Sequence, residues 1–589
     1  MTFTRYELAI PVELTSELHI GGVDPVPERD GEGTVIRFNR NGLKEPTIPG
    51  RSIRGAVRAA CNALREERKS EDDPLAADDG IFSDSNWESL WGDDLAHHEG
   101  DSPDDVLPVR RSALTFHAVS FPEYKDSDSG DSPLPKRHGV GIDRTTGAAS
   151  DGALYEHEFL PRGTKFDIRI TAEGRDGEKM GRDQSDGIPE PASSESVKKL
   201  LEVIVDVLTS GAVCLGGRTG SGQGTIQVIE PKLRSTGKTT DAGALTAPSD
   251  VLDALIGEDE EGTPIPLELG GWSPQEPARI RITWWSPTGI FVAEDEKLTK
   301  QRKAQKEAEN RKKGIDEEVH EVVYPLRDPS VAWDEAQLLI PGTSIRGALR
   351  SRASRIARTV LASRDDFERL ASHDIHEQIA AEPNLVRYMF GSTNYRGAVT
   401  VHDCLSTDPG KCIEVTHNAI DRWTGGVIDG GLFTEAVYLG THWEPITIDI
   451  DLRQLLNNIE AEKGEAKSKP KKAKTKETEQ DDQRESQQRE HVYAPYARAA
   501  YVLLGLVLAE LSAGTLPLGS RSTRGLGQVV VSTIKVEGAD REGVDLPSWD
   551  FNGCEALQQP ATGAGVMTDA LYKGQRELAR QILQHLKDK

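Results

Sequence analysis

The stretch Ile48–Arg58, with the sequence IPGRSIRGAVR, decides the organisation of this chain because it occurs twice. It returns at Ile340–Arg350 as IPGTSIRGALR, with the Pro-Gly pair, the serine and two arginine positions preserved. In each copy the Pro-Gly pair breaks the chain just before the serine, a good helix N-cap, and apolar residues follow at helical spacing. The sequence therefore predicts that each copy of the motif lies at the start of an amphipathic helix.

Two further segments recur in the same order. IDRTTG at 142–147 matches IDRWTG at 420–425, and LGGRTGSGQG at 215–224 matches LGSRSTRGLG at 518–527. The separations between the copies differ only by what loop insertions would add or remove. Three ordered matches predict a tandem duplication, in which each copy is a domain of ordinary size.

The composition between the motifs predicts the domain boundaries. We expect a first domain at 1–234, a linker at 235–274, a second domain at 275–540 and a C-terminal extension at 541–589. The second domain carries two apparent insertions. One, near 294–318, is charged and helix-prone, and the other, near 460–490, is a Lys/Glu/Gln-rich run with almost no apolar residues.

The order of predicted elements is also repeated. In the first copy we expect strands at 6–14 and 225–229 and helices at 53–65 and 197–208, with Pro11 marking an edge strand or a bulge. In the second copy the corresponding strands are 279–284 and 528–534, and the helices are 344–358 and 497–511. This pattern predicts an α+β fold of two tandem ferredoxin-like (RRM-like) domains, with the helices on one face of each sheet.

Composition limits the class of protein. The 589 residues carry a net charge of −26, which argues at first against a nucleic-acid partner. The acidic residues, however, concentrate in apparent loops, whereas the repeated motifs are rich in Arg and Gly, so the local charge matters more than the total. No stretch approaches the roughly 20 apolar residues of a membrane span. With no export signal and only five scattered cysteines, we expect a cytoplasmic protein without disulfides or structural zinc.

The duplicated helix motif has the residues of a phosphate-binding site. A helix N-terminus offers free N–H groups to anions, and arginines four residues apart share one face. The candidates are Gly50, Ser52, Arg54 and Arg58 in the first copy, and Ser344, Arg346 and Arg350 in the second. An ordinary capped helix with solvated arginines would explain one copy as well, but packing alone does not explain why both copies keep these polar positions.

The other motifs suggest contacts with a polyanion. The glycine-rich turns bring backbone close to a neighbour, and Arg218, Arg521 and Arg524 lie within them. Neither turn is a P-loop, because no Gly-Lys-Ser/Thr follows, and each alone could be a tight hairpin turn. Arg144 and Arg422 follow aspartates and either contact the same polyanion or form a local ion pair.

Together with LHIGG at 18–22, these motifs resemble the RAMP superfamily of CRISPR proteins, specifically the Csm/Cmr backbone subunits of type III effector complexes. Both halves are covered, as in the double backbone subunit of type III-D-like complexes. The resemblance implies an RRM-like core that grips the CRISPR RNA and a thumb-like hairpin that kinks the guide–target duplex. It also implies target RNA, other CRISPR effector subunits and a divalent cation (Mg²⁺ or Mn²⁺) as partners, with cleavage of the target beside each thumb.

The resemblance places a catalytic aspartate in the loop before the Ile-Pro-Gly motif. In the first copy this loop holds Asp24, Asp30 and Glu32, and Asp30 is the nearest aspartate to the expected position. In the second copy the candidates are Asp295, Asp316 and Asp328, and we favour Asp316. A carboxylate suits in-line attack by the RNA 2′-hydroxyl, because it can assist proton transfer or hold a divalent ion, but a solvated surface acid explains any single residue equally well.

Three functions fit these observations. The first is an RNA-guided endoribonuclease subunit, the second is a purely structural RNA-binding subunit, and the third is a nuclease that processes CRISPR RNA. His19, His117, His157 and His417 could act as general acids, although no pair has metal-ligand spacing and each fits a core or surface role better.

Overall fold

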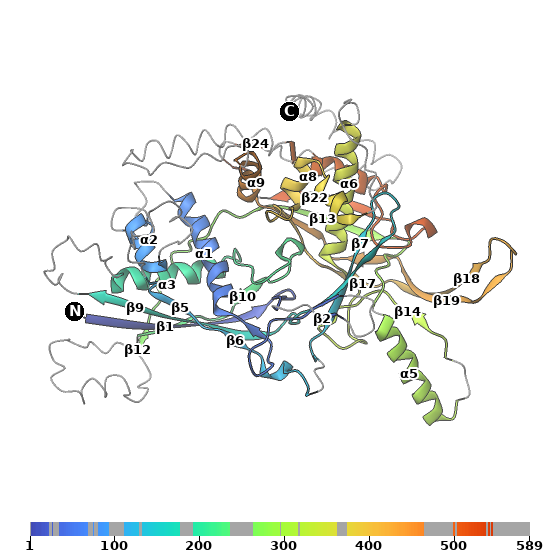
Figure 1. The fold of residues 1–589 in the computed structure, drawn as a ribbon, viewed down its shortest axis with the longest axis horizontal. Coiled ribbons are helices and arrows are strands. Elements are labelled where there is room, and N and C mark those ends of the chain that lie inside the picture. The colour runs from blue at the N-terminus through green and yellow to red at the C-terminus, as the bar shows by residue number, and fades with distance from the viewer. Residues whose placement is uncertain are drawn as a thin grey trace.

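The computed structural model describes residues 2–22, 26–27, 34–68, 75, 80–92, 111–128, 132–176, 192–235, 263–294, 296–315, 319–361, 374–464, 499–500, 503–537, 540–541 and 544–545. Each half of the chain forms a sheet with its own helices and its own hydrophobic core, and the two halves lie side by side (Figure 1). The fold is α+β, with two tandem ferredoxin-like domains, as predicted. Within the described part of the chain, every helix is too short or too polar to cross a bilayer.

The first half is built on a six-stranded sheet in the order β12-β11-β1-β9-β5, with β10 also paired to β1. Its elements are β1 (Thr2–Leu14), β2 (Val26–Pro27), β3 (Thr34–Ile36), β4 (Thr47–Ile48), α1 (Gly50–Glu67), α2 (Asp84–Trp91), β5 (Leu114–Phe116), β6 (Val119–Ser120), η2 (Pro122–Tyr124), β7 (Lys136–Ile142), β8 (Ala149–Glu158), β9 (Lys165–Asp176), α3 (Ser194–Thr209), η4 (Thr219–Ser221), β10 (Ile226–Val228), β11 (Lys232–Ser235) and β12 (Thr263–Ile265).

Strand β1 forms because its even-numbered residues from Tyr6 to Leu14 are buried while the residues between them are not. The expectation that Pro11 marks an edge or bulge is wrong, since β1 is an interior strand with β9 on one side. The other side of β1 changes partner from β11 to β10 at this point. The carbonyl of Pro11 accepts a hydrogen bond from Ile229 N (2.9 Å), between these two strands. The missing N–H of the proline therefore falls at a break in strand pairing.

Helices α1 and α3 cover one face of this sheet, as predicted (Figure 1). Helix α1 begins at Gly50 rather than after Ser52, with Pro49 as its N-cap, because the backbone N–H of Ser52 already bonds to Pro49 O (2.9 Å). The α1 face buried against α3 and the sheet consists of Ile53, Val57, Ala60, Cys61 and Leu64.

The second half is built on a seven-stranded sheet in the order β15-β17-β20-β13-β21-β16, with β22 paired to β13. Its elements are β13 (Ala278–Ser286), α5 (Glu296–Lys313), β14 (Val322–Val323), β15 (Leu339–Ile340), α6 (Gly342–Leu361), α7 (Ile375–Ala380), α8 (Asn384–Phe390), β16 (Val399–Val401), β17 (Cys404–Asp408), β18 (Lys411–Ile420), β19 (Val427–Leu439), β20 (Thr441–Trp443), β21 (Ile446–Ile450), α9 (Leu452–Gly464), η6 (Ser522–Arg524), β22 (Val530–Glu537), β23 (Asp540–Arg541) and β24 (Val544–Asp545). A further helical segment spans 503–512.

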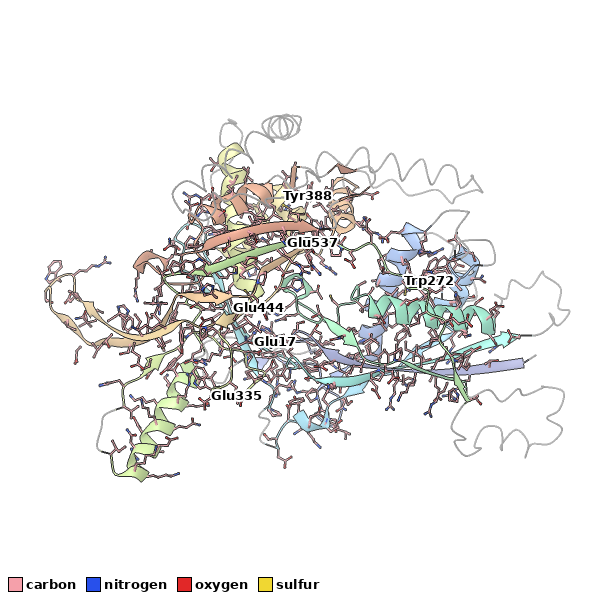
Figure 2. All side chains as sticks on the ribbon, turned by 180° about the vertical axis from the view of Figure 1, so that it is seen from behind. Glu17, Trp272, Glu335, Tyr388, Glu444 and Glu537 are labelled. Carbon is pink, nitrogen blue, oxygen red and sulfur yellow. The ribbon has the colours of Figure 1, made fainter. Side chains whose placement is uncertain are left out.

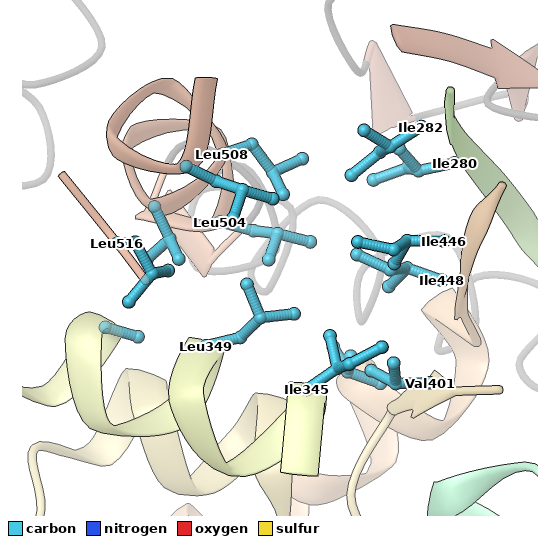
Figure 3. Close-up of a cluster of buried hydrophobic side chains, with 14 of the residues drawn as sticks. Ile280, Ile282, Ile345, Leu349, Val401, Ile446, Ile448, Leu504, Leu508 and Leu516 are labelled. Carbon is cyan, nitrogen blue, oxygen red and sulfur yellow. The ribbon is translucent and has the colours of Figure 1, made fainter. Parts of the chain in front are cut away.

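The core of the second half lies between its sheet and two helices (Figure 3). Ile345 and Leu349 of α6, with Leu504 and Leu508 of the segment 503–512, face the buried isoleucines of β13 and β21. These two helices correspond to α1 and α3 of the first half, so the duplicated sequence gives duplicated packing.

Parts of the predicted linker and insertions are described. The linker residues 263–265 form β12 at the edge of the first sheet, and the chain then crosses α3, where Glu202 and Asp206 accept the N–H groups of Glu268 (3.0 Å) and Gly270 (2.8 Å). The insertion near 294–318 contains α5, as its composition suggests. The other insertion, near 460–490, lies outside the described residues from 465 on, and the predicted extension is described only at 541 and 544–545.

Candidate RNA-binding groove

The Ile-Asp-Arg motifs form the tips of two long hairpins, β7–β8 and β18–β19 (Figure 1). In the first tip, the Asp143 carboxylate accepts hydrogen bonds from Thr145 N (2.8 Å) and from the Thr145 hydroxyl (2.7 Å). In the second tip, Asp421 accepts from Trp423 N (2.8 Å) in the same way. Each aspartate therefore shapes its own turn.

The two tips differ in their surroundings. The first lies against the second half of the chain, where Gln378 donates to Asp143 Oδ1 (2.5 Å) and accepts from Arg144 N (2.9 Å). The Arg144 guanidinium pairs with buried Glu382, also of the second half. The second tip points away from the body of the molecule, and Trp423 at its end is 95% exposed.

The glycine-rich turns place an arginine in a strained backbone conformation in both copies. Arg218 has φ = 59° and Arg521 has φ = 64°, in the left-handed region that costs most residues about 1 kcal/mol or more. Glycine would adopt this conformation without that cost, so stability alone does not explain the two arginines. The Arg218 side chain lies over the ring of Tyr155, 4.8 Å from its centre, whereas Arg521 pairs with buried Glu435 (2.5 Å).

Glycine at the helix starts is required by close packing. A Cβ atom on Gly50 would lie 2.1 Å from Phe116 O, and one on Gly342 would lie 2.2 Å from Val401 O. In the second copy, other residues of the same chain already contact the N-terminus of the helix. The Gly342 N–H donates to Asp403 Oδ1 (2.7 Å), and Ser221 O of the first half lies beside it.

The motif arginines contact the end of the next helix in each copy. Arg54 donates to Trp91 O, the last residue of α2, and Arg346 donates to Phe390 O (2.6 Å), the last residue of α8. Burial, with repulsion from the nearby Arg350, lowers the pKa of Arg346 to about 10. These arginines thus supply donors to carbonyls that a helix end leaves unpaired.

A groove of ≈ 2670 Å³ lies between the two halves. Hairpin β7–β8 and the η4 turn line it from the first half, and α6 and the η6 turn line it from the second. Its lining contains thirteen Lys and Arg residues against three Asp and Glu, although the chain as a whole has a charge of −26. Charges of one sign on the walls of a cleft concentrate their field, so the groove is suited to a polyanion.

The structure brings together half of the predicted RNA-binding residues in this groove. Those that line it are Arg144, Arg218, Ser344, Arg346, Arg350 and Arg521. Those that do not line it are Gly50, Ser52, Arg54, Arg58, Arg422 and Arg524. RNA binding stays a prediction for both sets, and the second set lies apart from the groove, at the α1 start and in the second hairpin and turn.

The groove cations differ in how far they are already neutralised. Arg144 and Arg350 share the buried carboxylate of Glu382. Arg355 and Arg396 are exposed in the groove, and no acidic side chain of the described residues pairs with them. Sequence reasoning missed both residues. For Arg355 a signal was present, because α6 carries an arginine on almost every turn from Arg346 to Arg358.

Two glycines mark positions of open space on the motif helices. Gly55 and Gly347 are exposed in the interiors of α1 and α6, and a Cβ atom on either would meet nothing within 4 Å. Glycine in a helix interior costs roughly 0.5–1 kcal/mol relative to alanine. Packing therefore does not require either glycine, and Gly347 lies in the groove lining.

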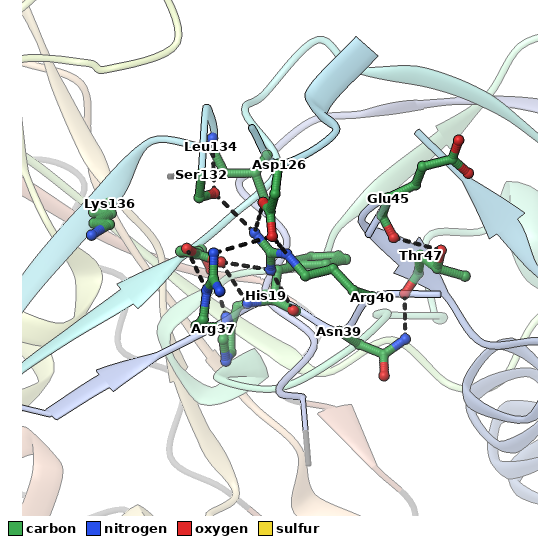
Figure 4. Close-up of polar contacts among 12 residues, drawn as sticks. His19, Arg37, Asn39, Arg40, Glu45, Thr47, Asp126, Ser132, Leu134 and Lys136 are labelled. Carbon is green, nitrogen blue, oxygen red and sulfur yellow. Dashed lines mark hydrogen bonds and ion pairs between the residues drawn. The ribbon is translucent and has the colours of Figure 1, made fainter. Parts of the chain in front are cut away.

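The candidate catalytic acids Asp24, Asp30, Glu32, Asp295 and Asp316 lie outside the described residues. The chain that follows the first loop is held by ion pairs, in which Arg40 contacts Asp126 (2.8 Å) and Glu158 (2.7 Å), as Figure 4 shows in part.

The remaining candidate acid, Asp328, is described and pairs with Arg162 across the two halves (2.9 Å). No group of three or more His, Cys, Asp or Glu suited to a metal ion occurs in the part of the chain that the structure describes.

The histidines take structural positions. His19 shares a hydrogen bond with Glu158 O (2.6 Å), and His117 shares one with Thr171 Oγ1 (3.1 Å). Burial and nearby Arg218 lower the pKa of His157 to about 2, so this ring stays neutral. His417 lies on the second hairpin, stacked on Phe433.

Comparison with known proteins supports the duplication. No curated protein matches the chain significantly. The family model of the RAMP superfamily matches residues 12–227 and again residues 338–530. The two matched regions each span one set of the three repeated motifs and together cover most of the sequence. The chain therefore belongs to the RAMP superfamily, of which it contains two tandem copies.

Proposed function

We propose that the chain is a CRISPR RNA-binding backbone subunit of a type III effector complex and that the groove between its halves holds the guide. The observation that carries this proposal is the predominance of basic residues, thirteen Lys and Arg against three Asp and Glu, in the lining of one groove of a strongly acidic protein. Phosphate contacts supply most of the sequence-independent affinity for RNA, which a guide-holding subunit needs because guides differ in sequence.

Other effector subunits are proposed as partners because the first hairpin already contacts a second RAMP repeat within this chain, as it would contact a repeat of another subunit. Its tip uses Asp143 and Arg144 to bind Gln378 and Glu382 of the next repeat. The second tip carries the same Asp-Arg pair at 421–422, and no other repeat contacts it among the described residues. The η6 turn is likewise exposed, whereas η4 packs on α6. A further RAMP unit would complete both contacts.

We also propose that the subunit cleaves target RNA. Asp30 is the favoured acid in the first copy, with Asp24 and Glu32 as alternatives, and Asp316 is favoured in the second. Attack of the 2′-oxygen on the adjacent phosphorus forms the O2′–P bond and breaks the P–O5′ bond. A carboxylate can take the 2′-hydroxyl proton, and the departing 5′-oxygen takes a proton from water and leaves as a free hydroxyl. A divalent cation, Mg²⁺ or Mn²⁺, would supply charge neutralisation at the phosphate.

RNA binding is tested with three groove arginines that lack a carboxylate partner among the described residues. We expect the triple variant Arg218→Gln, Arg355→Gln, Arg396→Gln to bind single-stranded RNA more weakly, with a salt dependence shallower by roughly 0.7 per lost contact. The control triple variant is Lys165→Gln, Arg169→Gln, Lys232→Gln, which removes the same charge from exposed positions on the first sheet outside the groove. Equal affinities and equal slopes for the two variants would refute RNA binding in the groove.

Cleavage is tested in the assembled complex with guide RNA. Asp30→Asn should abolish one set of target cuts, leave guide and target binding intact and spare the cuts made by other units, and EDTA should stop all cuts. An undiminished cut pattern after replacement of all the first-loop acids and Asp316 would favour the purely structural subunit. Cutting of the guide precursor instead of the target would favour the processing nuclease.

A further inference from the structure

Helix α5 is a basic arm in an acidic protein. Glu296–Lys313 contains eight Lys and Arg residues against three Glu, and its last turn carries Arg311, Lys312 and Lys313. Beyond Lys303 the helix is mostly exposed, and it projects from the second half beside β14 (Figure 1). At 1.5 Å per residue, the 18-residue helix is about 27 Å long.

The base of α5 is fixed firmly to the body of the molecule. Arg302 lies over the ring of Trp333, 3.6 Å from its centre, and pairs with buried Glu294. The Glu294 carboxylate also accepts hydrogen bonds from the Thr299 hydroxyl (3.0 Å) and from Tyr324 N (3.3 Å). These contacts set the direction of the helix before any ligand binds.

The anchored end of α5 is part of the groove wall. Leu298 and Lys300 of its first turns line the groove, as do Glu294 and Trp333, which hold it. The basic lining of the groove therefore continues along α5 past the edge of the cavity. A strand that leaves the groove on this side would run beside the helix.

The chemistry of α5 selects the partner. A helix without an apolar stripe has no face to bury against a protein core. Spaced Lys and Arg residues on an exposed rod instead match the backbone of a nucleic acid. We propose that α5 is a sequence-independent contact for the RNA strand that extends beyond the groove. This inference rests on the proposed RNA binding in the groove.

The test uses the full chain and two single-stranded RNAs, one of about 8 nucleotides and one of about 40 nucleotides. The α5 variant is Lys306→Gln, Arg311→Gln, Lys312→Gln, which leaves the anchor at Arg302 unchanged. It should weaken binding of the long RNA about tenfold and lower its salt slope by roughly 0.7 per lost contact, up to about 2. The short RNA, which the groove alone accommodates, should bind as it does to the unmodified protein.

The control triple variant at Lys165, Arg169 and Lys232 carries the same charge change and should bind both RNAs normally. If the α5 variant binds the long RNA like this control, α5 is not an RNA contact, whatever else it binds. If the groove triple variant binds both RNAs weakly and the α5 variant binds both normally, the α5 proposal is refuted and RNA binding in the groove is supported. No effect of either variant would overturn both proposals.

Discussion

Arg137 of the first half donates a hydrogen bond to Asp403 of the second half at 2.8 Å, and this contact joins the two repeats at the wall of the groove, which Arg137 lines. The other oxygen of Asp403 accepts the Gly342 N–H at the start of α6 (2.7 Å). Arg137 is buried and also pairs with Glu17 (2.7 Å), which lies near the middle of the molecule in Figure 2. One aspartate thus links the base of the first hairpin to the second motif helix.

Replacement of Asp403 should destabilise the protein. Asp403→Asn keeps an oxygen for the Gly342 N–H but leaves the buried Arg137 charge poorly compensated, at a cost of about 3 kcal/mol. Arg162→Ala is a suitable control, because it breaks the partly exposed Arg162–Asp328 pair between the same halves and should cost about 1 kcal/mol or less. Urea unfolding of both variants measures the difference. Equal losses would show that burial of Arg137 adds nothing to the junction.

Glu17 should make stability depend on pH. Burial raises the pKa of Glu17 from 4.5 to about 8, although Arg137 opposes the shift. The folded protein therefore holds a proton that the unfolded chain releases above about pH 4.5. Stability should fall as the pH rises from about 4.5 toward 8, by at most about 1.4 kcal/mol per pH unit. Glu17→Gln removes this contribution, so the two proteins should diverge between pH 5 and pH 8 in urea unfolding. Parallel stability profiles would contradict the raised pKa.

Two substitutions of Arg218, to glycine and to alanine, should differ in stability but not in RNA affinity. Glycine relieves the left-handed backbone that alanine keeps, so Arg218→Gly should be about 1 kcal/mol more stable than Arg218→Ala. Both variants lose the guanidinium and should bind RNA equally weakly. Thermal unfolding and RNA titration of this pair separate backbone strain from side-chain chemistry. A normal affinity of the glycine variant would remove Arg218 from the RNA interface.

Gly347→Ala should raise the stability of the protein and weaken its binding of RNA. Alanine fits the open space beside α6 and should stabilise the helix by roughly 0.5–1 kcal/mol. If RNA approaches the helix backbone at this point of the groove, the added methyl group should weaken RNA binding several-fold. Gly55→Ala is the matched control, since Gly55 has the same helix position and open space but does not line the groove. The same affinity for both variants would argue against a close approach at Gly347.

Local structure was predictable wherever a short stretch decides it. The alternation in β1, the helical spacing after each Ile-Pro-Gly motif and the charged character of α5 all led to the observed elements. The prediction of Ser52 as the N-cap was wrong by three residues, because the helices already begin at Gly50 and Gly342, which pack against a neighbouring strand. That packing depends on residues more than fifty positions away, which no local pattern contains.

The sequence by itself determined that the chain is two RAMP copies, because duplicated motifs in one order need no structure to be recognised. Only the tertiary structure decided which motif residues meet. Arg218 and Ser344 share one groove although 126 positions separate them, whereas Arg54 and Arg346 bind the ends of helices whose positions depend on core packing. The physical reason is the distance along the chain over which each interaction acts. Backbone conformation and periodicity act over a few residues, but a groove between two domains forms only where their surfaces dock.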